Sequence, residues 1–339
     1  MTSRFLQDIV RQRAEMPRII DCLMGPGQDT MRQAVSVIGS AADLILTGIG
    51  ASWNADLAAG SLFYWRGGAV HMQEAGELLH FAVVIVVPTK LDHGISVNTY
   101  SSLLIASGAL ASSTTTGFAS IASQLSESVA EAGRSLYSWR EQVEESNWLA
   151  TGAPYYFLAR GGRLGTCQEA RLLWEEGVKV SATAMSTSAF RHGPQEIVGE
   201  RVRFCMWIDQ ALMRDQDLSM AQDLRKLGGS LIVLGENLPH DAGDLVCQLP
   251  TSPPRWQFAI DVLPIQLAAE RLSRMSGVNC DSFRVCSCVV EMSMACWDRK
   301  PTRLRVLTEN ASSRLLWMQS SLYQCPRTRA DSLRKRTHA

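Results

Sequence analysis

The sequence predicts an α/β protein made of two successive halves, each with a parallel sheet. Short apolar runs alternate along the chain with helical stretches, which is the order of βαβ units. The run 81–88 is almost continuously β-branched, as expected for a strand buried on both faces of a parallel sheet. A strand, a glycine turn and a helix opened by a hydroxyl residue occur twice, at 43–54 and at 154–166. This repetition indicates two related halves.

The elements of the first half follow from apolar spacing and from turn residues. Apolar residues at helical spacing predict helices, and short apolar or β-branched runs predict strands. In chain order we expect helices at 3–14 and 29–38, a strand at 43–48, a helix at 55–65, strands at 69–73 and 81–88, and a small-residue helix at 98–113.

The second half repeats this order after a long helical connector at 114–150. The connector carries Glu and Ser at its exposed positions. Beyond it we expect a strand at 154–159, a helix at 167–177, a strand at 202–208, a helix at 219–227, strands at 230–234 and 245–249, and a helix at 258–275. The chain then divides into an N-terminal helical segment at 1–29, a first half at 30–112, a helical linker at 113–149, a second half at 150–291 and a tail at 292–339.

The tail differs from the body in charge. It holds ten basic and three acidic residues, which leaves 23 basic and 30 acidic residues in the body of this 33-to-33 balanced chain. Its apolar residues follow neither the helical nor the strand period. We expect a poorly ordered appendage. A nucleic-acid-binding arm is the alternative, but the tail has no repeated motif that alternates basic and aromatic residues.

Composition narrows the class of protein. The overall charge is zero, no apolar run approaches the ~18 residues of a membrane span, and the first residues are charged and amphipathic. Nine cysteines form no CxxC pair, which favours reduced thiols. We therefore expect a cytoplasmic protein with no membrane contact. The scattered histidines predict no metal site, and we expect no cofactor.

The first glycine turn is a candidate phosphate site. Gly48 and Gly50 allow a tight path from strand to helix, and the Ser52 hydroxyl adds a hydrogen-bond donor at the positive end of the helix. The sixth position of a dinucleotide fingerprint would be glycine, but here it is Trp53. The alternative is that these glycines only permit close packing of the strand on the helix.

The motifs together resemble the sugar isomerase (SIS) domain family. The first half carries GIGASWN at 48–54 and the second carries FRHGP at 190–194, and the likeness covers about residues 30–291. It extends to the isomerase half of glucosamine-6-phosphate synthases and to phosphosugar deglycases and deaminases. The resemblance implies two three-layer αβα halves with parallel sheets. We expect the first half to lack a βαβ unit, because only ten residues separate Phe81 from Asp92.

The resemblance also implies a set of site residues. Glu176 matches the carboxylate that transfers a proton, and His192 matches the histidine that opens the sugar ring and comes from the partner subunit. The positions that match contacts to phosphate or sugar are Gly50, Ala51, Ser52, Glu77, Ser96 and Asn98. Without the resemblance, Glu176 could equally be interpreted as a solvated carboxylate at a helix end. The alternative for His192 is a surface or capping histidine. Glu169 lies seven residues before Glu176 and shares its helix face.

The implied function is that of an aldose–ketose isomerase, or of an aminosugar-phosphate deaminase or deglycase, working through an enediol-type proton transfer in a homodimer. The alternatives are a non-catalytic module that binds sugar phosphates and an inactive product of an altered SIS gene. A complete glutamine-dependent aminotransferase is the least supported enzyme, because Leu173 stands where the family has a lysine and 285–291 lacks the terminal lysine.

Overall fold

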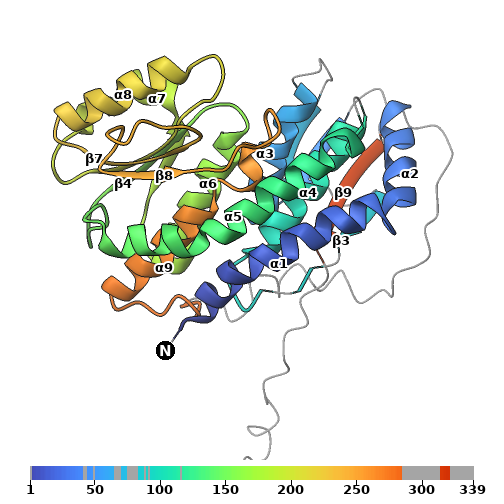
Figure 1. Ribbon diagram of the computed structural model, residues 1–339, viewed down its shortest axis with the longest axis horizontal. Coiled ribbons are helices and arrows are strands. Elements are labelled where there is room, and N and C mark those ends of the chain that lie inside the picture. The colour runs from blue at the N-terminus through green and yellow to red at the C-terminus, as the bar shows by residue number, and fades with distance from the viewer. Residues whose placement is uncertain are drawn as a thin grey trace, which may run out of the picture.

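The computed structural model describes residues 2–40, 44–48, 50–64, 70–74, 83–87, 89–90, 92–114, 117–284 and 314–320. Two parallel sheets form, with helices packed against them (Figure 1). The fold class expected from the sequence, α/β with parallel sheets, is therefore confirmed.

The first sheet has four strands in the order β2-β1-β9-β3, all paired in parallel. Its elements are α1 (Arg4–Met24), α2 (Gln28–Gly39), β1 (Leu44–Gly48), α3 (Ala51–Tyr64), β2 (Val70–Glu74), β3 (Val83–Val87), α4 (Asn98–Ser113) and, from the far end of the chain, β9 (Arg314–Ser320). Helix α1 runs ten residues further than expected from the sequence and contains Pro17.

Strand β9 differs from the expectation of a poorly ordered tail at 292–339. It lies between β1 and β3 (red in Figure 1), with Val83 opposite Leu316 and Ile45 opposite Leu315. The tail was expected to be poorly ordered because its apolar residues do not alternate with polar ones as they do in a half-buried strand. A central strand of a parallel sheet is covered on both faces, so it needs no alternation. Within the first sheet β9 holds the position next to β1 that β6 holds next to β4 in the second sheet.

The second sheet has five parallel strands in the order β5-β4-β6-β7-β8, the doubly wound order in which the second strand lies outside the first. Its elements are α5 (Ala119–Glu145), β4 (Tyr155–Ala159), α6 (Arg163–Leu173), the π-turn η2 (Trp174–Val178), β5 (Thr183–Ser186), α7 (Thr187–Arg191), η3 (Pro194–Ile197), β6 (Arg203–Trp207), α8 (Arg214–Lys226), β7 (Ser230–Gly235), β8 (Leu245–Gln248), η4 (Gln257–Ala259) and α9 (Leu263–Met275). Strand β5 and helix α7 were not predicted from the sequence, because both are short and built largely from small residues.

The two halves join through tightly packed helices. Helix α3 of the first half packs directly on α6 of the second, where a Cβ on Gly165 would lie 2.5 Å from both the Cβ and the backbone nitrogen of Ala58. Gly162 makes a similar approach to Ala58 and Ser61. Helix α1 runs across the molecule alongside α4 and α5 and contacts both of them (Figure 1). Residues at the ends of α3 and α6 therefore have fixed relative positions.

Candidate functional site

Glu176 lies where α6 ends in the π-turn η2. A single π-turn of this kind is rare in helices and often marks a functional site. The turn is anchored by Trp174, which is fully buried and whose ring centroid lies 4.9 Å from that of Phe157 and 5.3 Å from that of Tyr155. Glu176 itself is half-buried. Burial raises the pKa of Glu176, and the nearby Lys179 opposes that rise.

Lys179 is a neighbour of Glu176 that was not predicted from the sequence as a site residue. It ends the π-turn in the left-handed region, with φ of 64°, and its Nζ donates a hydrogen bond to the backbone oxygen of Glu176. Its Nζ also lies 5.2 Å from the centroid of the Phe283 ring. Burial lowers the pKa of Lys179, and Glu176 opposes that change. A non-glycine residue in the left-handed region is uncommon, and the spacing of residues in the sequence does not predict it.

The first glycine turn lies against the same helix. Gly50 has φ of 58°, and a Cβ at that position would lie 3.8 Å from Cδ2 of Leu172, about one turn before Glu176. Gly48 is also required, because a Cβ there would lie 2.6 Å from the backbone nitrogen of Trp53. Ala51 and Ser52 open α3, so their backbone N–H groups belong to the positive end of that helix. Packing thus brings the predicted phosphate turn and the predicted proton-transfer residue to one region.

The loop before α4 approaches this region from the first half. Asp92 accepts hydrogen bonds from the backbone N–H groups of Val97, Asn98 and Thr99 at 2.9, 3.0 and 2.9 Å, which caps α4. Asn98 is 1% exposed, and its side-chain amide donates to Asp92 at 2.6 Å. In this structure Asn98 therefore stabilises the loop.

The remaining site residues predicted from the sequence are Ser96, His192 and Glu77, and the first two lie in different parts of the protein. Ser96 is half-buried in the same loop, beside Ile95, whose Cδ1 lies 3.2 Å from where a Cβ on Gly177 would be. His192 is exposed in the segment after α7, which packs on β4, β5 and η3. Glu77 lies outside the described residues.

Glu169 faces the interior, unlike Glu176. It is 1% exposed, and the Asn54 side chain of α3 donates to it at 3.0 Å. Burial raises the pKa of Glu169 to about 8, and the charges of Glu176 and Asp92 push it in the same direction. Of the two carboxyls on this helix face, Glu176 is the accessible one. Burial raises the pKa of both carboxyls, and perturbed pKa values of this kind cluster at functional sites.

Glu169 should make stability fall as pH rises. Its folded pKa of about 8 exceeds the ordinary value of 4.5, so the unfolded chain holds fewer protons between those values and the free energy of unfolding decreases with pH. Glu169→Gln keeps an acceptor for Asn54 and cannot ionise. Between pH 5 and 8 the variant should gain up to about 1.4 kcal/mol per pH unit over the wild type in urea unfolding. If the free energy of unfolding depends on pH in the same way in the wild type and in Glu169→Gln, this prediction is wrong.

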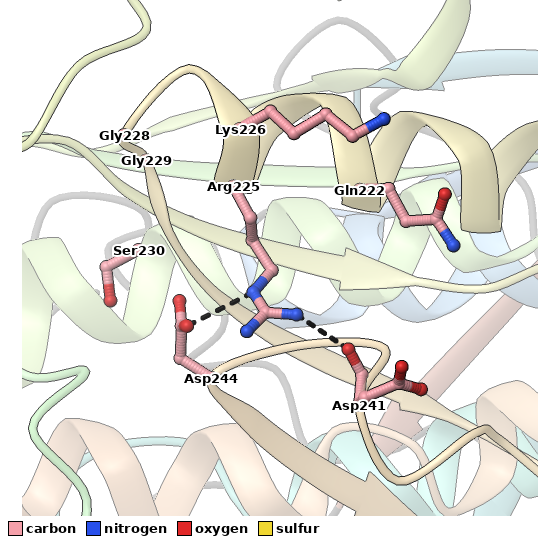
Figure 2. A pocket seen from close by; sticks show the side chains of 8 residues that line it. All are labelled: Gln222, Arg225, Lys226, Gly228, Gly229, Ser230, Asp241 and Asp244. Carbon is pink, nitrogen blue, oxygen red and sulfur yellow. Dashed lines mark hydrogen bonds and ion pairs between the residues drawn. The ribbon is translucent and has the colours of Figure 1, made fainter.

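A separate depression at the amino end of β7 contains none of the predicted residues (Figure 2). It is lined by Gln222, Arg225, Lys226, Gly228, Gly229, Ser230, Asp241 and Asp244. Arg225 is engaged there by the Asp244 carboxylate at 3.1 Å and by the backbone oxygen of Asp241 at 2.6 Å. The guanidinium of Arg225 is therefore already paired with a carboxylate.

The described part of the chain contains no group of three or more His, Cys, Asp or Glu residues able to hold a metal ion. Among these same residues, no helix is both long and apolar enough to cross a membrane.

The fold agrees with that of sugar isomerase proteins, and the resemblance seen in the sequence is confirmed. Over 131 residues, 38% of this chain, the sequence is 25% identical to a glutamine–fructose-6-phosphate aminotransferase (isomerizing) of Pyrococcus horikoshii. A Thermus thermophilus protein of the same name is 25% identical over 134 residues. These matches span 22% of each relative's length. No family model matches the chain.

Solved structures share the fold over most of the chain. The C-terminal domain of a Francisella tularensis glucosamine–fructose-6-phosphate aminotransferase has a TM-score of 0.71 at 17% identity, covering 83% of this chain and 99% of that one. An Escherichia coli tagatose-6-phosphate ketose/aldose isomerase has a TM-score of 0.70 at 16% identity, covering 84% and 96%. A Thermotoga maritima glucosamine-6-phosphate deaminase has a TM-score of 0.62 at 16% identity, covering 82% and 97%.

Proposed function

We propose that this protein binds a phosphorylated sugar or aminosugar and moves a proton between its adjacent carbons, as an aldose–ketose isomerase or an aminosugar-phosphate deaminase or deglycase. The observation that carries the proposal is the position of Glu176. This half-buried carboxyl with a raised pKa lies beside Lys179, on the helix that packs against the phosphate-type turn at Gly50. The names of the similar proteins support the same substrate class.

In the proposed mechanism Glu176, when ionised, takes a proton from one carbon of the open-chain sugar and returns it to the neighbouring carbon. A base with a pKa raised toward neutrality is better matched to that task than an ordinary carboxylate. Lys179 supplies positive charge beside the carboxylate and beside the negative charge that develops on the enediol oxygens. The N–H groups at the start of α3 and the Ser52 hydroxyl hold the phosphate.

We further propose a homodimer in which His192 opens the sugar ring at the partner's site. His192 is exposed on the second half, as a residue acting across a subunit interface must be before assembly.

A second candidate is a module that binds sugar phosphates without catalysis. The short connection between Phe81 and Asp92 favours it, because no serine- or threonine-rich loop is present there to supply further phosphate donors.

Thermal unfolding with a panel of hexose and hexosamine 6-phosphates tests the proposed ligand class. A ligand present at a hundred times its Kd should stabilise the fold by about 2.7 kcal/mol. Ser52→Ala removes a hydrogen bond to a charged group and should weaken binding by about 1.5–3 kcal/mol, roughly ten- to hundredfold in Kd. Ser135→Ala on α5 is the control and should bind as the wild type does. A panel without any stabilising sugar phosphate would refute both candidate functions.

A further inference from the structure

His93 forms a second acid–base group with a buried carboxylate of α1. Its ring nitrogen Nδ1 lies 3.0 Å from Oδ1 of Asp8, and its backbone N–H donates to Oδ2 of the same carboxylate at 2.9 Å. The Asp8 side chain is 1% exposed, whereas that of His93 is 44% exposed. An ionised carboxylate only accepts hydrogen bonds, so Nδ1 carries the proton and Nε2 is the nitrogen left to exchange protons with a ligand.

The loop that carries this histidine packs against the turn that carries Glu176. Two residues after it, Ile95 packs against Gly177 of the π-turn. One residue after it, a Cβ on Gly94 would lie 3.7 Å from the Phe283 ring, which also faces Lys179. The loop that carries His93 and the turn that carries Glu176 and Lys179 therefore contact each other directly and share the Phe283 ring.

A cation of α1 also pairs with the carboxylate of Asp8. Arg11, one turn further along α1, places Nη1 2.8 Å from Oδ1 of Asp8, and its Nη2 lies 3.5 Å from Oδ1 of Asp92. A fixed carboxylate that orients an imidazole through Nδ1, with the other nitrogen available, is the arrangement by which histidine acts as a proton carrier.

We propose that His93, oriented by Asp8, is a catalytic residue that carries a proton between the two oxygens of the sugar while Glu176 carries one between the two carbons. This inference rests on the proposed isomerase function. In the open-chain aldose, imidazolium Nε2–H protonates the carbonyl oxygen O1 as Glu176 removes the proton from C2. Neutral Nε2 then takes the proton from O2 as Glu176 returns its proton to C1, and the C2=O2 bond forms. The enzyme ends in its starting protonation state, and no oxidant or further reactant is needed.

The test compares His93→Gln with the control His240→Gln, which alters an exposed histidine between β7 and β8. General acid–base groups typically contribute 10²–10⁴-fold. We expect His93→Gln to lower kcat for the sugar phosphate that the wild type converts by about 10²-fold or more, with the Kd of that ligand changed less than threefold. His240→Gln should leave both values unchanged. Equal kcat for His93→Gln and wild type would overturn the assignment of His93 and leave the proposed function intact.

A measurement without turnover tests the orientation of the ring. In nitrogen-15 NMR of histidine-labelled wild type, His93 should show the Nδ1–H tautomer when neutral, and Asp8→Asn should reduce that preference. A neutral His93 in the Nε2–H form would overturn the role of Asp8. If the wild type converts no sugar phosphate, the proposed function fails and the catalytic role of His93 fails with it, while the tautomer result still reports on the dyad.

Discussion

Glu176→Gln should lower kcat about 10²–10⁴-fold and leave the binding of the sugar phosphate nearly unchanged. Glutamine keeps the shape of the side chain at the end of α6 but has no basic carboxylate. Burial raises the pKa of Glu176. In the wild type, kcat should therefore rise with pH, and the apparent pKa of that rise should lie above the pKa of an ordinary glutamic acid. Steady-state kinetics together with a direct binding measurement separates the loss of turnover from the loss of affinity.

Glu175→Gln is the matched control, because Glu175 is the adjacent carboxylate and differs in its surroundings. Its side chain is 38% exposed and pairs with Arg171 at 2.8 Å on the helix surface. A surface pair of this kind contributes about 0–1 kcal/mol to stability. The control should therefore retain wild-type turnover. If the two variants lose activity equally, the effect comes from the local charge and not from a proton-transfer role of Glu176.

Gly165→Ala should destabilise the protein by at least about 2 kcal/mol, although alanine is the better helix former. A Cβ at Gly165 would lie 2.5 Å from the Cβ and the backbone nitrogen of Ala58 and also meet the backbone oxygen of Asn54. Backbone atoms of a packed helix cannot turn away as a flexible side chain does, so α3 and α6 must separate. Urea unfolding measures the change.

The control for this prediction is Gly39→Ala, in the last turn of α2. No described atom lies within 4 Å of the Cβ that alanine would add there. Without a clash, the substitution should be neutral or should stabilise by up to about 1 kcal/mol. Equal stabilities of Gly165→Ala and Gly39→Ala would show that the contact between the halves is not as close as the structure has it.

Much of the fold followed from local sequence patterns. Strand 83–87 was predicted by its β-branched run, and the helix at 98–113 by its small and apolar residues, since both patterns are contiguous in the sequence. Strand β9 could not be predicted in this way. Its place depends on a gap between β1 and β3, which only the assembled sheet defines.

The candidate site was predictable only where a motif marked it. GIGASWN indicated the turn at Gly50, and the resemblance indicated Glu176 at the end of a helix. Lys179 and His93 could not be assigned, because their significance comes from a π-turn with a left-handed residue and from Asp8 on a helix 85 positions away in the sequence. Asn98 matched a substrate-contacting segment, yet its side chain lies buried among Asp92 and α1.

The central claim is that Glu176 moves a proton at a sugar carbon, and hydrogen exchange with heavy water measures this step directly. The protein is incubated in deuterium oxide with the hexose or hexosamine 6-phosphate that stabilises it most, and deuterium on C1 and C2 is followed by NMR. We expect carbon-bound deuterium with the wild type and with Glu175→Gln, and a rate at least about 10²-fold lower with Glu176→Gln. No exchange by the wild type, or equal exchange by Glu176→Gln, would contradict it.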